Sequence, residues 1–210
     1  ELETHKIRLV TEANLNDEQK DFLSQFFYDK LNGSVNPIWL SEIEDLTVLE
    51  DNRIYLIVEK CEKKDNKKKY AIVKVPDRIY GRWVKIPSSD GFDNIMYLDD
   101  VIRYCLPLVF LGFKESTYRA YSFKFTKDAE MEMDNDADFG TMEKIALGVN
   151  SRKKGEAVRV IYDHEMPREM QRKLRDRLNT KELDASLAGG RYQNHKDLMS
   201  FPDCGHKELK

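Results

Sequence analysis

Two neighbouring stretches of this chain, Arg53–Lys60 (RIYLIVEK) and Tyr70–Pro76 (YAIVKVP), decide its fold class. Both are rich in isoleucine, valine and tyrosine, as β-strands are. The charged segment Glu62–Lys69 between them suits an exposed hairpin loop. We expect Arg82–Pro87 (RWVKIP) to add a third strand, so the centre of the chain is predicted to be an antiparallel meander.

Helical patterns flank this meander. Asn16–Leu31 is predicted to be a helix, because Asn16 and Gln19 can form a capping box and apolar residues repeat on one face. A short helix is expected to begin near Asp99 and to meet Pro107. Further on, we expect a half-buried strand at Ser116–Phe125, a helix at Phe139–Ser151 and a strand at Ala157–Tyr162. A helix at Pro167–Leu178 and a Gly-Gly turn with a short helix at Gly189–Pro202 are expected to follow.

The length and the order of these elements indicate the architecture. The chain has 210 residues, of which 40% are hydrophobic and 35% charged, which is enough for one domain with its own core. Helices and strands follow one another without repeats or a long linker. We therefore predict an α+β fold, with helices packed against a mostly antiparallel sheet in a single compact domain.

Composition excludes several classes of protein. No apolar run approaches the ~20 residues that a membrane-spanning helix needs, and no signal peptide is recognisable at Glu1–Val10. The widely spaced Cys61, Cys105 and Cys204 form neither a disulfide framework nor a paired metal motif, which favours a reducing cytoplasm. The net charge of -3 gives no overall attraction to nucleic acid. Since the chain does not start with Met, we expect both ends to be boundaries of a piece of a longer protein.

An acidic run invites a cation-binding interpretation. Its carboxylates occupy every second position: Asp128, Glu130, Glu132, Asp134, Asp136 and Asp138. An EF-hand loop starting at Asp134 fails, because Phe139 stands where glycine is needed and Ile145 where glutamate is needed. We interpret the run as a solvated strand end that leads into a capped helix.

The C-terminal third of the chain is basic. Between Ser151 and Asp197 twelve lysines and arginines stand against eight acids. Such a patch suits phosphate binding, because arginine can form two parallel hydrogen bonds to a phosphate and lysine adds a compact positive charge. The alternative is the charged outer face of an amphipathic helix, which the i,i+4 pair Glu169 and Lys173 supports.

The segment Gly189–Tyr192 (GGRY) is the most specific candidate site. Two glycines let a backbone turn sharply close to a ligand, and Arg191 with Lys196 can hold an oxyanion. We name Arg191, Tyr192 and Lys196 as candidate substrate-binding residues. The alternative is a helix C-cap and turn in which Tyr192 is packed.

A catalytic set is missing from the sequence patterns. His164 and His195 lack a recognisable metal motif, nucleophile or ligand partner, although Asp197 lies close to His195 in sequence. No serine stands in a GxSxG motif. We therefore assign no catalytic residue and no metal ligand to this chain.

Four segments together resemble the middle, or head, domain of the long-chain bacterial polyphosphate kinases. The segments lie in the family's order: Leu98–Phe110 (LDDVIRYCLPLVF), Ala120–Glu130 (AYSFKFTKDAE), Gly155–Pro167 (GEAVRVIYDHEMP) and Gly189–Pro202 (GGRYQNHKDLMSFP). The resemblance implies a head domain over residues 1–203, with 204–210 beginning the link to catalytic domains. One departure stands in the last segment, because the family usually reads GGRYHNFKD where this chain has Gln193 and His195.

This resemblance implies a function for the whole enzyme. The family reversibly transfers the terminal phosphate of ATP to polyphosphate through a phosphohistidine, with Mg²⁺, and the catalytic domains lie outside this segment. No bound cofactor is expected here. The implied role is dimerisation and architecture in a cytoplasmic enzyme, with peripheral membrane association of that enzyme left open.

Three hypotheses follow. The first is this scaffold and dimerisation domain, and the second is a module that itself binds polyphosphate through the basic patch. The third is a stand-alone phosphatase or hydrolase that uses His164 or His195.

Overall fold

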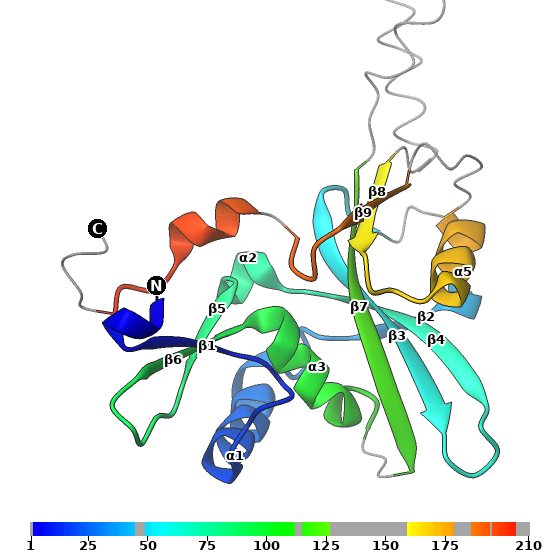
Figure 1. Cartoon of the computed structure of the whole chain (residues 1–210). Coiled ribbons are helices and arrows are strands. Elements are labelled where there is room, and N and C mark those ends of the chain that lie inside the picture. The colour runs from blue at the N-terminus through cyan, green and yellow to red at the C-terminus, as the bar shows by residue number, and fades with distance from the viewer. Residues whose placement is uncertain are drawn as a thin grey trace, which may run out of the picture.

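The computed structural model describes residues 2–44, 49–111, 115–126, 159–178, 186–193 and 195–204. Two sheets and four α-helices form the framework (Figure 1). The α-helices are α1 (Asp17–Phe26), α2 (Asp77–Tyr80), α3 (Leu98–Val109) and α5 (Arg168–Leu178). Shorter helical turns are η1 (Leu2–His5), η2 (Phe27–Leu31), η3 (Leu40–Glu42) and η7 (His195–Ser200).

The large sheet has six strands in the order β2-β4-β3-β7-β8-β9. Their bounds are β2 (Pro37–Trp39), β3 (Arg53–Glu62), β4 (Lys68–Lys74), β7 (Ser116–Thr126), β8 (Arg159–Asp163) and β9 (Ser186–Gly189). Neighbours run antiparallel, except that β9 pairs parallel with β8 at one edge. The predicted α+β class with a mostly antiparallel sheet is therefore confirmed.

The small sheet corrects the predicted meander. Its strands are β1 (Ile7–Val10), β6 (Asp93–Tyr97) and β5 (Trp83–Ile86), with β1 and β6 parallel. The strand predicted at Arg82–Pro87 forms as β5, but it pairs with β6 and not with β4. Between β4 and β5 the one-turn helix α2 and Gly81, whose φ of +73° suits glycine, turn the chain away from the large sheet.

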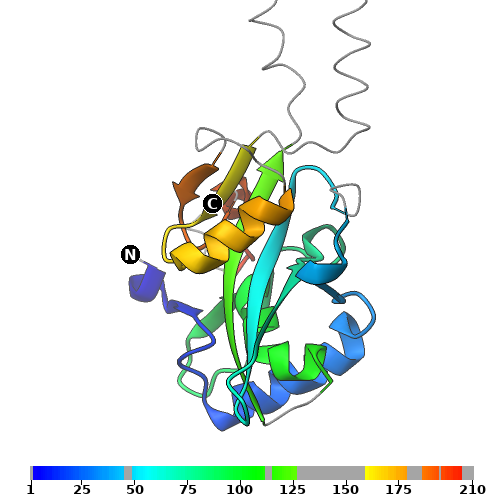
Figure 2. The same ribbon diagram turned by 90° about the vertical axis from the view of Figure 1, so that its right-hand side faces the viewer.

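Two hydrophobic cores cover the two faces of the large sheet. One face packs against α1, α3 and the small sheet, with Leu23, Val101 and Met96 buried. The other face packs against α5, with Met170 and Leu174 buried as the helical spacing predicts. Figure 2 shows α5 lying across this second face. The half-buried strand that alternation predicted is found at the start of β7, where Thr117 and Arg119 are exposed, whereas Ser122 and Phe123 further along are buried on opposite faces.

That burial is visible on both sides of β7. Phe123 stacks on Tyr55 in the second core, with 5.6 Å between ring centroids. Ser122 points to the opposite face and is also buried. Its hydroxyl donates to the Arg191 carbonyl oxygen, so a polar residue is satisfied where periodicity suggested solvent.

The hydrogen bonds predicted for the start of α1 are present. Asn16 Oδ1 accepts from the Gln19 backbone N–H at 2.9 Å, and Gln19 Oε1 accepts from the Asn16 N–H at 3.1 Å. This is the predicted capping box. The helix then loosens into η2 and ends before Gly33, which has φ of +88°.

The acidic run and the helix expected at Phe139–Ser151 fall outside the described residues. The helix predicted to begin near Asp99 forms as α3, and it continues through Pro107 to Val109. Among the described residues, no helix is long and apolar enough to cross a membrane.

Candidate functional site

The segment that contains the candidate residues joins the two sheets. It leaves the large sheet at the end of β9 and runs to η7, which lies beside the small sheet (Figure 1). There Trp83 Nε1 of β5 donates to the Asp197 carbonyl oxygen at 2.9 Å, and Phe201 packs edge-on against the Trp83 ring. We call the described residues between Gly190 and Phe201 the strap, because they connect β9 with β5.

Arg191 is bound by carboxylates of the same chain. Its Nη2 lies 2.6 Å from Glu12 Oε1 and 3.0 Å from Asp100 Oδ1. Burial acts to lower the pKa of the guanidinium, but Glu12 and Asp100 outweigh this effect and raise it. The positive charge that the sequence offered to a phosphate is thus neutralised within the domain.

Tyr192 is packed and hydrogen-bonded. Its ring stacks on Tyr97 with 3.8 Å between centroids and 11° between planes. Its hydroxyl donates to Asp100 Oδ2 at 2.6 Å. Burial and the neighbouring Asp100 carboxylate raise the pKa of Tyr192, so its hydroxyl stays a donor.

These contacts belong to a larger group, which we call the arginine–carboxylate cluster. Its members are Arg82, Arg103 and Arg191 with Glu12, Asp99, Asp100 and Asp197.

Adjacent acids in the first turn of α3 form the centre of the cluster. Arg82 holds Asp99 through two contacts of 2.6 and 3.1 Å, and its Nε lies 3.0 Å from Asp197. Arg103 Nη1 donates to Asp100 at 2.6 Å. The side chains of Asp99 and Asp100 are fully buried.

Burial makes each charge of this cluster depend on its partner. It raises the pKa of Asp99, and the arginines Arg82 and Arg103 act in the opposite direction. Removing one member of a buried ion-pair group costs about 3–5 kcal/mol, because a charge is left without its partner. The cluster ties the segment after β1, the start of α3, β5 and the strap together.

Lys196 does not join this cluster. Its side chain is exposed, and within the described ranges no carboxylate forms an ion pair with it. Asp197 beside it pairs with Arg82. The structure thus brings Arg191 and Tyr192 together and leaves Lys196 at the surface.

The first glycine of the Gly-Gly pair has a packing role. Gly189 lies in β9, so the helix C-cap considered as the alternative is wrong. A Cβ at Gly189 would stand 2.7 Å from Ile161 Cγ2 of β8. Gln193 is buried next to it and donates to the Gly190 carbonyl oxygen at 2.9 Å.

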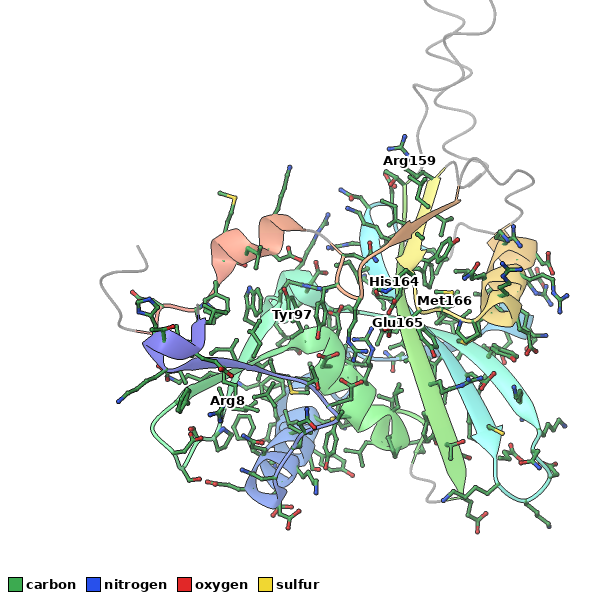
Figure 3. All side chains as sticks on the ribbon, in the orientation of Figure 1. Arg8, Tyr97, Arg159, His164, Glu165 and Met166 are labelled. Atoms are coloured by element: carbon green, nitrogen blue, oxygen red, sulfur yellow. The ribbon has the colours of Figure 1, made fainter. Side chains whose placement is uncertain are left out.

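Among the described side chains, the remaining candidate groups show no catalytic arrangement, and the side chain of His195 lies outside the described part. Figure 3 places His164 and Glu165 in the turn after β8, away from Tyr97 at the end of β6. His164 Nδ1 lies 3.1 Å from the Gly189 carbonyl oxygen. The Cys105 side chain is fully buried, and this burial raises the pKa of its thiol to about 12, which disfavours the thiolate. Across the described part of the chain, no group of three acids, histidines or cysteines is placed to hold a metal ion.

Arg191 and Tyr192 stand out in the sequence, but their partners Glu12 and Asp100 do not. One local signal exists, since Asp100 and Arg103 stand three residues apart in a short helix that is mostly apolar after its first turn. Glu12 gives no such signal, because it lies 179 residues from Arg191.

Comparisons with known proteins agree on one family. The family description "Polyphosphate kinase middle domain" matches residues 18–201. The polyphosphate kinase of Vibrio parahaemolyticus serotype O3:K6 is 33% identical over 214 residues, which is 100% of this chain and 30% of that protein. The polyphosphate kinase of Escherichia coli K12 is 31% identical over 213 residues, again 100% of this chain and 31% of that protein.

A solved structure shows the same relationship. The crystal structure of polyphosphate kinase from Porphyromonas gingivalis superposes with a TM-score of 0.75 at 28% identity, and covers 100% of this chain and 29% of that chain. The chain therefore spans about 30% of the length of the curated relatives it matches. With a matching family description over most of its residues, this chain belongs to the polyphosphate kinase middle-domain family.

Proposed function

We propose that this chain is the middle domain of an ATP–polyphosphate phosphotransferase. That enzyme reversibly transfers the terminal phosphate of ATP to polyphosphate through a phosphohistidine outside residues 1–210. Family membership supports the assignment, as does the span of about 30% of the related kinases. ATP and Mg²⁺ are used by the whole enzyme, and polyphosphate is its second substrate.

Within that enzyme, we assign dimerisation and architecture to this domain. The observation that carries the architectural role is the arginine–carboxylate cluster, in which Arg82, Arg103 and Arg191 are all paired internally. Phosphoryl transfer needs a nucleophile, charge neutralisation and in-line positioning. The described residues offer cations without a nucleophile placed beside them, which supports a framework role.

Phosphate contact by Arg191, Tyr192 and Lys196 stays a prediction. Arg191 would have to give up Glu12 or Asp100 to bind a phosphate, and Tyr192 would have to leave Asp100. Lys196 is exposed and is the member of the three that can reach a phosphate without breaking the cluster.

A second candidate function is guidance of polyphosphate by this domain itself. It is favoured by cations on one face of α5, among them Lys173 and Arg177. We further propose that the enzyme is cytoplasmic, and that the domain extends over residues 1–203 with 204–210 starting the link to the catalytic domains.

Two measurements test the proposal. Sequencing the reading frame beyond Lys210 is expected to reveal histidine-bearing catalytic domains, and a frame that stops near Lys210 would overturn the assignment. Sedimentation of the chain over a concentration series is expected to show dimers or larger assemblies. A monomer at every concentration would refute the dimerisation role while leaving the family assignment intact.

A further inference from the structure

A cavity of about 570 Å³ lies between one edge of the large sheet and α5. The sheet side is formed by Trp39 at the end of β2 and by Lys68–Tyr70 at the start of β4. The helix side is formed by Lys173 and Arg177. Cavities of this size hold small ligands in proteins, but their linings are usually mostly apolar. Here four cationic side chains line the space.

The cations come from two opposing walls. Lys68 and Lys69 stand on the sheet edge. Lys173 and Arg177 are four residues apart and therefore share one face of α5. Glu42 and Asp176 also line the cavity, so the lining keeps an excess of positive charge. An anion inside it can contact cations on both sides.

Aromatic rings hold two of these lysines in place. Lys69 Nζ lies 5.8 Å from the centre of the Trp39 ring, and Lys173 Nζ lies 4.9 Å from that of Tyr70. A cation over a ring is attracted by the ring face without losing its charge. Within the part of the chain that is described, Lys69, Lys173 and Arg177 form no ion pair with a carboxylate.

Glu59 of β3 and Glu169 of α5 already contact residues of the lining. The Tyr70 hydroxyl lies 3.0 Å from both Glu59 and Glu169. Lys68 lies 3.3 Å from Glu59 and 4.0 Å from Glu169, so it is the one lining cation whose charge these acids balance. The other three keep their charge available for a ligand.

We propose that this cavity binds a stretch of inorganic polyphosphate, an inference that rests on the proposed function. A linear chain of phosphates can meet the cations of both walls at once. A nucleotide fits less well, because ammonium groups already cover the Trp39 and Tyr70 ring faces on which a base would stack.

The test is titration of the chain with polyphosphate of defined length, with ATP and orthophosphate in parallel, at about 50 mM and about 200 mM salt. The cavity variant is Lys69→Ala with Arg177→Ala. Its control is Lys64→Ala with Arg172→Ala, which removes the same charges from exposed residues of the same hairpin and helix outside the cavity. Thermal unfolding checks that both variants are folded.

We expect polyphosphate to bind the parent chain and the control alike, with ATP and orthophosphate much weaker. The cavity variant should bind about tenfold more weakly, with a salt dependence reduced by about one unit of log–log slope per lost contact. Equal binding by both variants, no binding by the parent chain, or tighter binding of ATP that the cavity variant abolishes would each overturn the inference. None of these outcomes touches the dimerisation role, which sedimentation measures separately.

Discussion

Replacing Asp100 with asparagine should remove the charge at the centre of the arginine–carboxylate cluster. The Asp100 carboxylate is fully buried and accepts from Arg103 at 2.6 Å, Arg191 at 3.0 Å and Tyr192 at 2.6 Å. Asparagine keeps the shape, but it turns an amide N–H₂ toward these donors and leaves two arginines short of counter-charge. Breaking a buried pair in this way costs about 3–5 kcal/mol.

The assay is urea unfolding followed by tryptophan fluorescence. Trp83 reports on the strap through its hydrogen bond to Asp197, and Trp39 reports on the distant contact with Phe110 at 5.3 Å. With an m value of about 2 kcal/mol/M, the expected loss moves the midpoint by about 1.5–2.5 M. A single transition, with m unchanged, is expected for both versions of the protein.

The matched control is Asp90→Asn. Asp90 also pairs with an arginine, Arg8 at 2.9 Å, but this pair is exposed and surface pairs contribute little. Its midpoint should move far less than that of Asp100→Asn. The reasoning about the cluster is refuted if the two variants shift the midpoint equally.

Three further predictions concern the strap and the sheet. Arg191→Ala should lose about 1–3 kcal/mol of unfolding free energy, less than Asp100→Asn because the Arg191 side chain is partly exposed whereas Asp100 is fully buried. Lys196→Ala should change it by about 0.5 kcal/mol or less, and equal losses for the two variants in urea titrations would contradict their different placement. Gly189→Ala should lose about 1–3 kcal/mol, because the added Cβ would stand 2.7 Å from the stiff, β-branched Ile161; an unchanged melting temperature would show that β8 and β9 separate easily. Burial acts to raise the pKa of Glu59, but its hydrogen bonds to basic and phenolic donors lower it below the usual 4.5. Its contribution to stability is then fully present above pH 4.5 and lost as the pH falls through the lowered pKa, so Glu59→Gln should show a weaker loss of stability in acid, and parallel pH profiles would refute this.

The parts of the fold that depend on local pattern could be predicted from the sequence. The capping box at Asn16 and the strands at Arg53–Lys60 and Tyr70–Pro76 depend on neighbouring residues alone, and all are present in the structure. The place of β5 depends on how the chain turns at Gly81, and on a partner strand chosen by packing. No periodicity in RWVKIP carries that information.

The candidate site also has a part that the sequence predicts and a part that only the fold creates. Arg191 and Tyr192 stand out beside two glycines, so their importance is visible in the sequence. What they contact is not visible, because Glu12 and Asp100 are brought to them by the packing of β1 and α3. A phosphate-binding arginine and an internally paired arginine give the same sequence pattern, and only the partner distinguishes them.

The most direct test of the central claim is an assay of ATP-dependent polyphosphate synthesis with two proteins side by side. One is this 210-residue chain, and the other is the product of the whole reading frame that contains it. The framework role predicts synthesis by the longer product and none by the chain alone. Polyphosphate formed from ATP by the chain alone, and lost on substitution of His164 or His195, would contradict it.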